Sequence, residues 1–163
     1  MKFYLNDRAL LKISGSDSEI FLQNQLSNDI NKLKKSQIQL NAFCQHQGKI
    51  IALFWVLRYK DSLLLSFPAD LAEKVIVRLK MFVIMSDVLI ENISGQYSQI
   101  GLINENNSNA YRINDSESLL IVSEEIKTKD VNDNNDEWRR SLIKSQIPEV
   151  FISTSEKFVP QML

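Results

Sequence analysis

The sequence has few of the residues that build the commonest reactive sites. Its 163 residues include one cysteine and one histidine, so no internal disulfide can form and the ligands of a structural zinc site are lacking. It has four glycines and no P-loop, GxGxxG or GxSxG motif, so neither a phosphate-binding loop nor a recognisable nucleophile is expected. The scarcity of cysteine favours a reducing, cytoplasmic setting.

The sequence also lacks an excess of charge of one sign and any long apolar run. It has 19 basic and 20 acidic residues, which leave a net charge of −1 and no overall positive field. The most apolar segment, Lys49–Leu57, is too short to cross a bilayer and is typical of a buried strand. Lys32, Lys34 and Lys35 are more typical of a solvated face than of a basic patch. The sequence therefore predicts no direct nucleic-acid partner and no membrane partner.

Cys44 and His46 are the only residues whose types and spacing suggest a metal. Two residues apart in a strand, they would point to the same face, so a metal pair is geometrically possible. Two ligands are too few for a structural site, and no CxxC or HExxH motif supplies others. A buried cysteine and a turn histidine are favoured, so no metal is predicted.

An amide-rich segment, Phe21–Ile30, follows a predicted helix start. Ser16 with Glu19 three residues later matches a capping box, so a helix is expected to begin there. The segment Ser27–Asp29 is expected to end or restart the helix, because its side chains can bond nearby backbone groups. The residues expected on the buried side of the helix are Ile20, Phe21, Leu22 and Leu26.

Apolar runs predict a series of strands interrupted by one helix. A Gln-His-Gln-Gly turn at Gly48 joins two runs in a hairpin, and Lys60-Asp61 makes a second tight turn. A helix is expected from Pro68 to about Met85. This order predicts an α+β fold, an antiparallel meander covered by a helix. The expected strands are Phe3–Leu5, Leu10–Ser14, Gln37–Cys44, Lys49–Tyr59, Leu63–Phe67, Val88–Ile93, Tyr97–Ile103 and Ser118–Val122, and the helix is expected to bury Leu71, Val75, Leu79 and Phe82.

The last third of the chain is more polar. The asparagine-rich segment Asn104–Asn109 predicts a loop, and Lys127–Glu137 predicts a polar connection. A final helix is expected over Asp136–Lys144 and is ended by Ile147-Pro148-Glu149. From there the chain is expected to run extended to Leu163.

Several short motifs occur in a fixed order along the chain. The first are Leu10-Leu11-Lys12-Ile13-Ser14-Gly15, FLQNQLSND, and Ala42-Phe43-Cys44 with Gly48-Lys49. The last are Trp138-Arg139, Ile147-Pro148-Glu149, and Phe158-Val159-Pro160-Gln161. Together they resemble YgfZ-type folate-binding proteins, in the superfamily of the glycine-cleavage T-protein, an aminomethyltransferase. Each motif is modest, but their order and spacing extend the resemblance over nearly the whole chain.

The resemblance implies a fold of three domains, of which this chain would supply the first two. Residues 1–36 and 124–163 would form a discontinuous first domain, and residues 37–123 an inserted ferredoxin-like α+β domain with an antiparallel sheet and a helix. The family's Lys-Gly-Cys-Tyr-x-Gly-Gln-Glu motif, which follows Phe-x-Pro-Gln, does not occur before Leu163. We therefore interpret the chain as truncated, with the third domain absent.

The resemblance also implies a ligand and partners. In the family a folate such as tetrahydrofolate lies in a central channel, and YgfZ-type members support iron–sulfur cluster assembly or repair and, through it, tRNA modification. Iron–sulfur client proteins are thus implied partners. Candidate folate contacts are Asn28 and Asp29, then Gln25, with Lys49 and Trp55 as weaker candidates. Asn28 and Asp29 fit equally well as a turn that fixes a corner of the fold, and Trp55 fits a core position better.

One departure from the family bears on catalysis. Aminomethyltransferases carry an aspartate near the folate's reactive end, at the position that Ala52 occupies here. Alanine can neither transfer a proton nor stabilise a cation, so the sequence favours a non-catalytic protein. A tetrahydrofolate-dependent aminomethyltransferase is the alternative enzyme. A third alternative is a ligand-free structural or interaction fragment, which would self-associate through the surface left by the missing domain.

Overall fold

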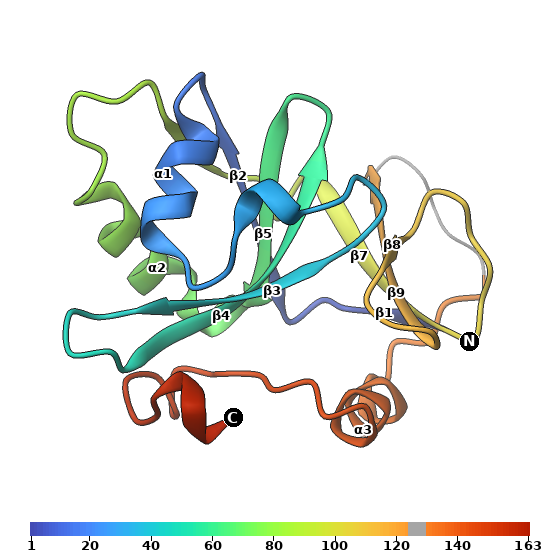
Figure 1. Cartoon of the computed structure of the whole chain (residues 1–163). Helices are drawn as coiled ribbons and strands as arrows, with labels where there is room; N and C mark the ends of the chain where they lie inside the picture. Colours follow the sequence, from blue (N-terminus) through green and yellow to red (C-terminus); the bar gives the residue numbers. More distant parts are fainter. Residues whose placement is uncertain (124–129) are drawn as a thin grey trace.

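Two antiparallel sheets form the framework of the molecule, which the computed structural model describes for residues 1–123 and 130–163 (Figure 1). One sheet has five strands and the other has four. The helices α1 (Ser18–Gln25) and α2 (Ala72–Lys80) lie together beside the five-stranded sheet, and α3 (Asp136–Lys144) lies on another side of the molecule (Figure 1). The predicted α+β class with antiparallel pairing is confirmed.

The five-stranded sheet contains β4 (Ile50–Tyr59), the longest strand among the described residues. In spatial order its strands are β3 (Gln39–Cys44), β4, β5 (Ser62–Pro68), β2 (Arg8–Ser14) and β6 (Leu89–Asn92). Gly48, with φ of 84°, turns the chain between β3 and β4 in a left-handed conformation that glycine adopts without strain. Lys60, with φ of 53°, turns it between β4 and β5. The predicted meander is confirmed over these three strands.

The four-stranded sheet joins the N-terminal strand to strands from the middle of the chain. In spatial order its strands are β1 (Lys2–Tyr4), β7 (Tyr97–Ile103), β9 (Glu117–Ser123) and β8 (Tyr111–Arg112). The strand β8 was not predicted, because two residues are too few to show an alternating pattern. The asparagine-rich segment 104–109 lies outside regular structure, as predicted.

The helix α1 (Ser18–Gln25) begins with a different cap from the one predicted. The capping box is wrong: Asp17 is the N-cap residue, and its side chain makes no capping hydrogen bond. Ser16 instead donates its hydroxyl to the Asp87 carboxylate, with an Oγ–Oδ2 distance of 2.8 Å. Glu19 forms an ion pair with an arginine of β4. A hydrogen bond to a residue 71 positions away in the sequence thus replaces the predicted bond within the first turn of the helix.

The helix α2 (Ala72–Lys80) follows a 3₁₀ turn, η2 (Ala69–Leu71), and ends before the predicted Met85. Beyond α2 the chain turns so that Asp87 packs against Gly15, where a Cβ atom would lie 2.1 Å from the Asp87 carbonyl oxygen. If α2 continued to Met85 as predicted, the chain could not turn to place Asp87 against Gly15. Phe82, which was predicted to be buried on this helix, lies beyond its end and is 50% exposed; Ile20 on α1, also predicted to be buried, is 66% exposed.

Both faces of the five-stranded sheet are buried, as the alternation along β4 shows. Phe54 and Val56 face an apolar layer beneath α1 and α2. Trp55 and Leu57 face an inter-sheet layer, which the four-stranded sheet and α3 (Asp136–Lys144) complete. A strand buried on both faces is apolar throughout, which explains the longest apolar run of the sequence. The helix α3 has its predicted bounds.

The C-terminal segment does not run extended as predicted. Turns over residues 152–156 bring the Glu156 N–H to 2.7 Å from the Ile50 carbonyl oxygen. The Ile50 N–H in turn donates to the Phe158 carbonyl at 2.8 Å. A 3₁₀ turn, η3 (Pro160–Met162), follows. These hydrogen bonds fold the segment alongside the beginning of β4.

The division into domains at positions 37 and 124 stays a prediction. The strand β2, from the first predicted segment, pairs with β5 and β6 of the predicted insert. Of the predicted polar connection Lys127–Glu137, residues 127–129 lie outside the described residues, and Asn132 donates its N–H to the Lys2 carbonyl at 2.8 Å. No helix among the described residues is long and apolar enough to cross a membrane.

Candidate functional site

The amide-rich segment after α1 forms a corner that its own side chains hold together. The Asn28 N–H donates to Oδ1 of Asn41 at 2.9 Å, and the Asn28 side-chain amide donates to a β3 carbonyl at 3.3 Å. Asp29 caps a 3₁₀ turn, η1 (Ile30–Lys32), because its Oδ1 accepts the Asn31 N–H at 3.0 Å. The predicted end and restart of the helix is confirmed. Both side chains serve the architecture of the corner.

The other predicted folate contacts come from α1, the turn before β4, and β4 itself. Gln25 is half-buried at the end of α1, and Lys49 is exposed in the turn before β4. Trp55 is only 2% exposed, with the Arg8 guanidinium 3.7 Å above its ring and Trp138 against its edge. No face of the Trp55 ring is open for a ligand to stack on. The five residues line neither of the cavities described below, and the roles of all five as folate contacts stay predictions.

The positions considered for catalysis or metal binding carry little reactive chemistry. Ala52 is fully buried on β4, and its methyl side chain can neither transfer a proton nor carry a charge. Cys44 is half-buried, and burial raises the pKa of its thiol. His46 is exposed in the turn that follows. Among the described residues, no group of three or more His, Cys, Asp or Glu side chains is placed to hold a metal ion.

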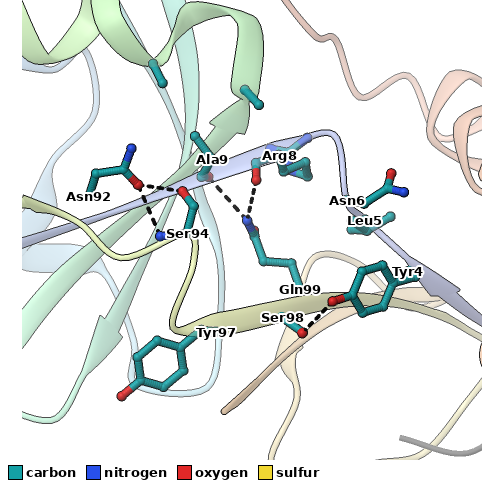
Figure 2. Close-up of a pocket in the computed structure, with 12 residues that line it drawn as sticks. Tyr4, Leu5, Asn6, Arg8, Ala9, Asn92, Ser94, Tyr97, Ser98 and Gln99 are labelled. Atoms are coloured by element: carbon teal, nitrogen blue, oxygen red, sulfur yellow. Dashed lines mark hydrogen bonds between the residues drawn. The ribbon is translucent and has the colours of Figure 1, made fainter. Parts of the chain in front are cut away.

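A cavity of about 380 Å³ opens between the two sheets, where β1 and β7 lie beside β2 (Figure 2). Its volume lies within the range of small-molecule sites. Tyr4 and Tyr97 contribute aromatic rings, and Asn6 and Asn92 contribute side-chain amides. These residues belong to different strands and turns. The pairing of β1 with β7, and of β2 with β6, brings them together. We call this hollow the inter-sheet cavity.

A buried polar network forms one wall of the inter-sheet cavity. Arg8 donates from Nε to Ser66 Oγ at 2.8 Å, and Ser66 donates from Oγ to Gln99 Oε1 at 2.5 Å. The Gln99 amide nitrogen donates to the carbonyls of Arg8 and Ala9, each at 3.3 Å (Figure 2). All three polar side chains are buried. Such a network is rigid when every member has partners, so it fixes the shape of the cavity wall.

The charge of Arg8 is balanced within the protein. Glu149 forms an ion pair with its guanidinium, and the Trp55 ring lies beneath it. Burial lowers the pKa of Arg8, and the charge and hydrogen bond of Glu149 act in the opposite direction. Glu149 belongs to one of the family-like motifs, whereas no sequence pattern indicated the role of Arg8. The pair ties β2 to the segment that follows α3.

The inter-sheet cavity is lined mainly by neutral polar and apolar side chains. Among the described residues that line it there is no cysteine, histidine or carboxylate. Its hydroxyl and amide groups donate and accept hydrogen bonds; Ser94, for example, donates to Asn92 Oδ1 at 2.6 Å. Asn6, Asn92 and Gln99 were not predicted as site residues. They come from separate segments, and no local pattern marks them.

Comparison with known proteins identifies relatives along almost the whole chain. No protein-family model matches it. An uncharacterized protein of Haemophilus influenzae is 27% identical over 98% of this chain and 58% of that protein. The tRNA-modifying protein YgfZ of Buchnera aphidicola subsp. Schizaphis graminum is 28% identical over 98% of this chain and 60% of its own length. The chain thus spans about three fifths of these curated relatives.

Two aminomethyltransferases match smaller parts. That of Exiguobacterium sibiricum is 40% identical over 93 residues, which are 56% of this chain and 26% of the enzyme. The crystal structure of glycine cleavage system aminomethyltransferase T from Bartonella henselae has a TM-score of 0.55 at 16% identity, and the match covers 61% of this chain and 27% of that one. This last likeness is one of fold alone.

The relatives and the fold together define a class: the chain is similar to proteins of the T-protein superfamily. Within that class, the likeness that runs nearly its full length is to YgfZ-type proteins. The resemblance predicted from the sequence motifs is confirmed.

Proposed function

We propose that the chain binds a folate, tetrahydrofolate or a related reduced form, without acting on it chemically. The observation that carries this proposal is the likeness to YgfZ over 98% of the chain. The buried Ala52 supports binding without methylene transfer, since no side chain there can exchange a proton or pair with a cation.

We assign the folate to the inter-sheet cavity. A pterin ring needs flat apolar contact and hydrogen bonds at its edge, and the cavity offers the Tyr4 and Tyr97 rings with the Asn6 and Asn92 amides. In this proposal Asn28 and Asp29 hold a corner of the fold and do not touch the ligand.

The cellular role that we propose follows the YgfZ-type relatives. One of them is named a tRNA-modifying protein. We propose that the chain acts in the cytoplasm to support iron–sulfur cluster assembly or repair, with iron–sulfur proteins as its clients and tRNA modification as one process that depends on them.

Calorimetric titration with tetrahydrofolate tests the ligand. We expect measurable heat and a thermal shift that grows with folate concentration. Asn6→Ala should weaken folate affinity roughly fivefold through loss of one hydrogen bond. Asn106→Ala, in an exposed loop, is the matched control and should bind as the parent does. Absence of both heat and thermal shift at high folate concentration would refute folate binding by this chain.

A second variant tests the assignment to the cavity. Asp29→Ala removes the cap of η1 and should cost about 1 kcal/mol of stability. Folate affinity should be unchanged in the folded variant. If affinity instead drops tenfold while Asn6→Ala binds normally, the corner contacts the folate and the cavity does not.

A further inference from the structure

A second hollow shares Tyr97 with the inter-sheet cavity. Its volume is about 680 Å³, and its lining includes Tyr59, Tyr97, Tyr111, Lys35 and Lys60. We call it the tyrosine groove. None of the residues predicted as folate contacts lines it.

Three tyrosines from three strands line the tyrosine groove. Tyr59 ends β4, Tyr97 begins β7, and Tyr111 begins β8. The rings of Tyr59 and Tyr97 meet edge to face, with centroids 5.8 Å apart. A hydrogen bond with Tyr97, together with burial, raises the pKa of Tyr59 to about 12, so its hydroxyl stays neutral at physiological pH. All three tyrosines are half-buried, so the protein fixes each ring and leaves part of it accessible.

The charge of the tyrosine groove differs from that of the whole chain. Lys35 and Lys60 are exposed at its edge, and Lys60 Nζ lies 5.2 Å from the centroid of the Tyr59 ring. Among the described residues that line it there is no Asp or Glu, although the chain has a net charge of −1. Lys60 also lines an adjoining hollow, which contains Asp61 and Glu91 and therefore has acidic groups that the described lining of the tyrosine groove lacks.

We propose that the tyrosine groove binds a nucleotide, with its base stacked on a tyrosine ring and its phosphate near Lys35 and Lys60. Aromatic side chains beside lysines are the arrangement that binds nucleotides without reading their sequence. A free mononucleotide and a nucleotide within a single strand present the same base and phosphate. The overall charge of the chain did not predict this site, because the feature is local. The inference does not depend on folate binding.

Titration with adenosine 5′-monophosphate and with a six-nucleotide single-stranded RNA tests this proposal. Both should bind, and tighter binding of the RNA would identify the single strand as the preferred source. Tyr111→Ala should weaken binding about tenfold, whereas Tyr111→Phe keeps the ring and should bind as the parent does. Phe82→Ala, which removes a half-exposed aromatic side chain outside both cavities, is the control and should bind as the parent does.

A charge variant keeps the test independent of folding. Lys35→Gln with Lys60→Gln changes exposed groups only, and it should weaken binding and flatten its salt dependence. Lys80→Gln, on α2, should do neither. Failure of both ligands to bind, or unchanged affinity in the double lysine variant, would overturn the proposal.

Measuring folate and nucleotide affinities of the same variants distinguishes this inference from the proposed function. Asn6→Ala should lower folate affinity and leave nucleotide affinity unchanged, and Tyr111→Ala should do the reverse. If tetrahydrofolate displaces the mononucleotide and Tyr111→Ala weakens both equally, the tyrosine groove is the folate site and the nucleotide assignment fails. If folate does not bind at all, the nucleotide result stands on its own.

Discussion

The two buried layers of the five-stranded sheet are filled in different ways. The apolar layer beneath α1 and α2 is packed from aliphatic and aromatic side chains, such as Phe54 between Phe43 and Phe67. The inter-sheet layer combines apolar packing with buried polar groups, among them Arg8 and Gln99. The inter-sheet cavity is lined in part by polar residues of this second layer, among them Arg8 and Gln99.

This difference indicates that the apolar layer mainly stabilises the fold, whereas the inter-sheet layer shapes a cavity that can bind a ligand. An apolar layer gains stability from close packing and tolerates few polar groups. A layer with a satisfied polar network can shape a polar cavity, at the cost of depending on every member of the network. The layers should therefore respond differently to mutation.

The largest effect is expected in the apolar layer. Phe54→Ala removes a fully buried ring that contacts two other phenylalanines, and it should lower the free energy of unfolding by about 4 kcal/mol. Urea denaturation measures the change. Phe82→Ala, whose side chain is half exposed, is the control and should cost far less. Similar losses in the two variants would show that this layer is not the main apolar core.

A slightly smaller effect is expected in the inter-sheet layer. Arg8→Ala leaves Glu149 without its partner, and should lower the free energy of unfolding by about 3 kcal/mol. Adding Glu149→Gln should cost less than the sum of the two single changes, because the groups are coupled. Arg112→Ala, which breaks an exposed ion pair with Asp115, should cost less than about 0.5 kcal/mol. Additive losses for Arg8 and Glu149 would contradict the network.

Substitutions at two glycines test how tightly α3 packs against the inter-sheet layer. A Cβ atom at Gly101 would lie 2.7 Å from ring carbons of Trp138, so Gly101→Ala should cost about 2 kcal/mol and change the tryptophan fluorescence. A Cβ atom at Gly95 would meet no other atom within 4 Å, so Gly95→Ala is the matched control. Equal stability of the two variants would mean that Trp138 moves away freely.

The smallest effect concerns pH. Hydrogen bonds from the Ser16 backbone N–H and then its hydroxyl lower the pKa of Asp87. A carboxyl with a depressed pKa stabilises the fold above its ordinary pKa of about 3.9, and this contribution is lost as pH falls through the lower folded value. Asp87→Asn should therefore weaken the pH dependence of unfolding below about pH 4. Urea denaturation across the acid range measures it, and an unchanged profile would count against the contact.

Local sequence patterns predicted the apolar layer better than the cavity. The hairpins around Gly48 and Lys60 and the buried run of β4 depend on neighbours in the sequence, so they were predicted well. The start of α1 was mispredicted because Ser16 bonds Asp87, which is 71 residues away. The early end of α2 also involves a contact distant in sequence, because the chain after α2 turns so that Asp87 packs against Gly15.

The candidate site was harder to predict for a related reason. The polar pattern around Asn28 and Asp29 correctly indicated a corner, because those side chains bond backbone groups close by in the chain. Asn6, Asn92 and Gln99 converge only through the register of paired strands. No spacing in the sequence reveals such a register, so these residues carry no local signal.

Amide NMR signals recorded during titration with tetrahydrofolate test the central claim most directly. Folate in the inter-sheet cavity should shift the signals of residues 4–9 and 92–99 and leave those of residues 25–29 and 49 unchanged. Shifts confined to residues 25–29 and 49, or no shifts at all, would contradict the assignment of the folate to the inter-sheet cavity.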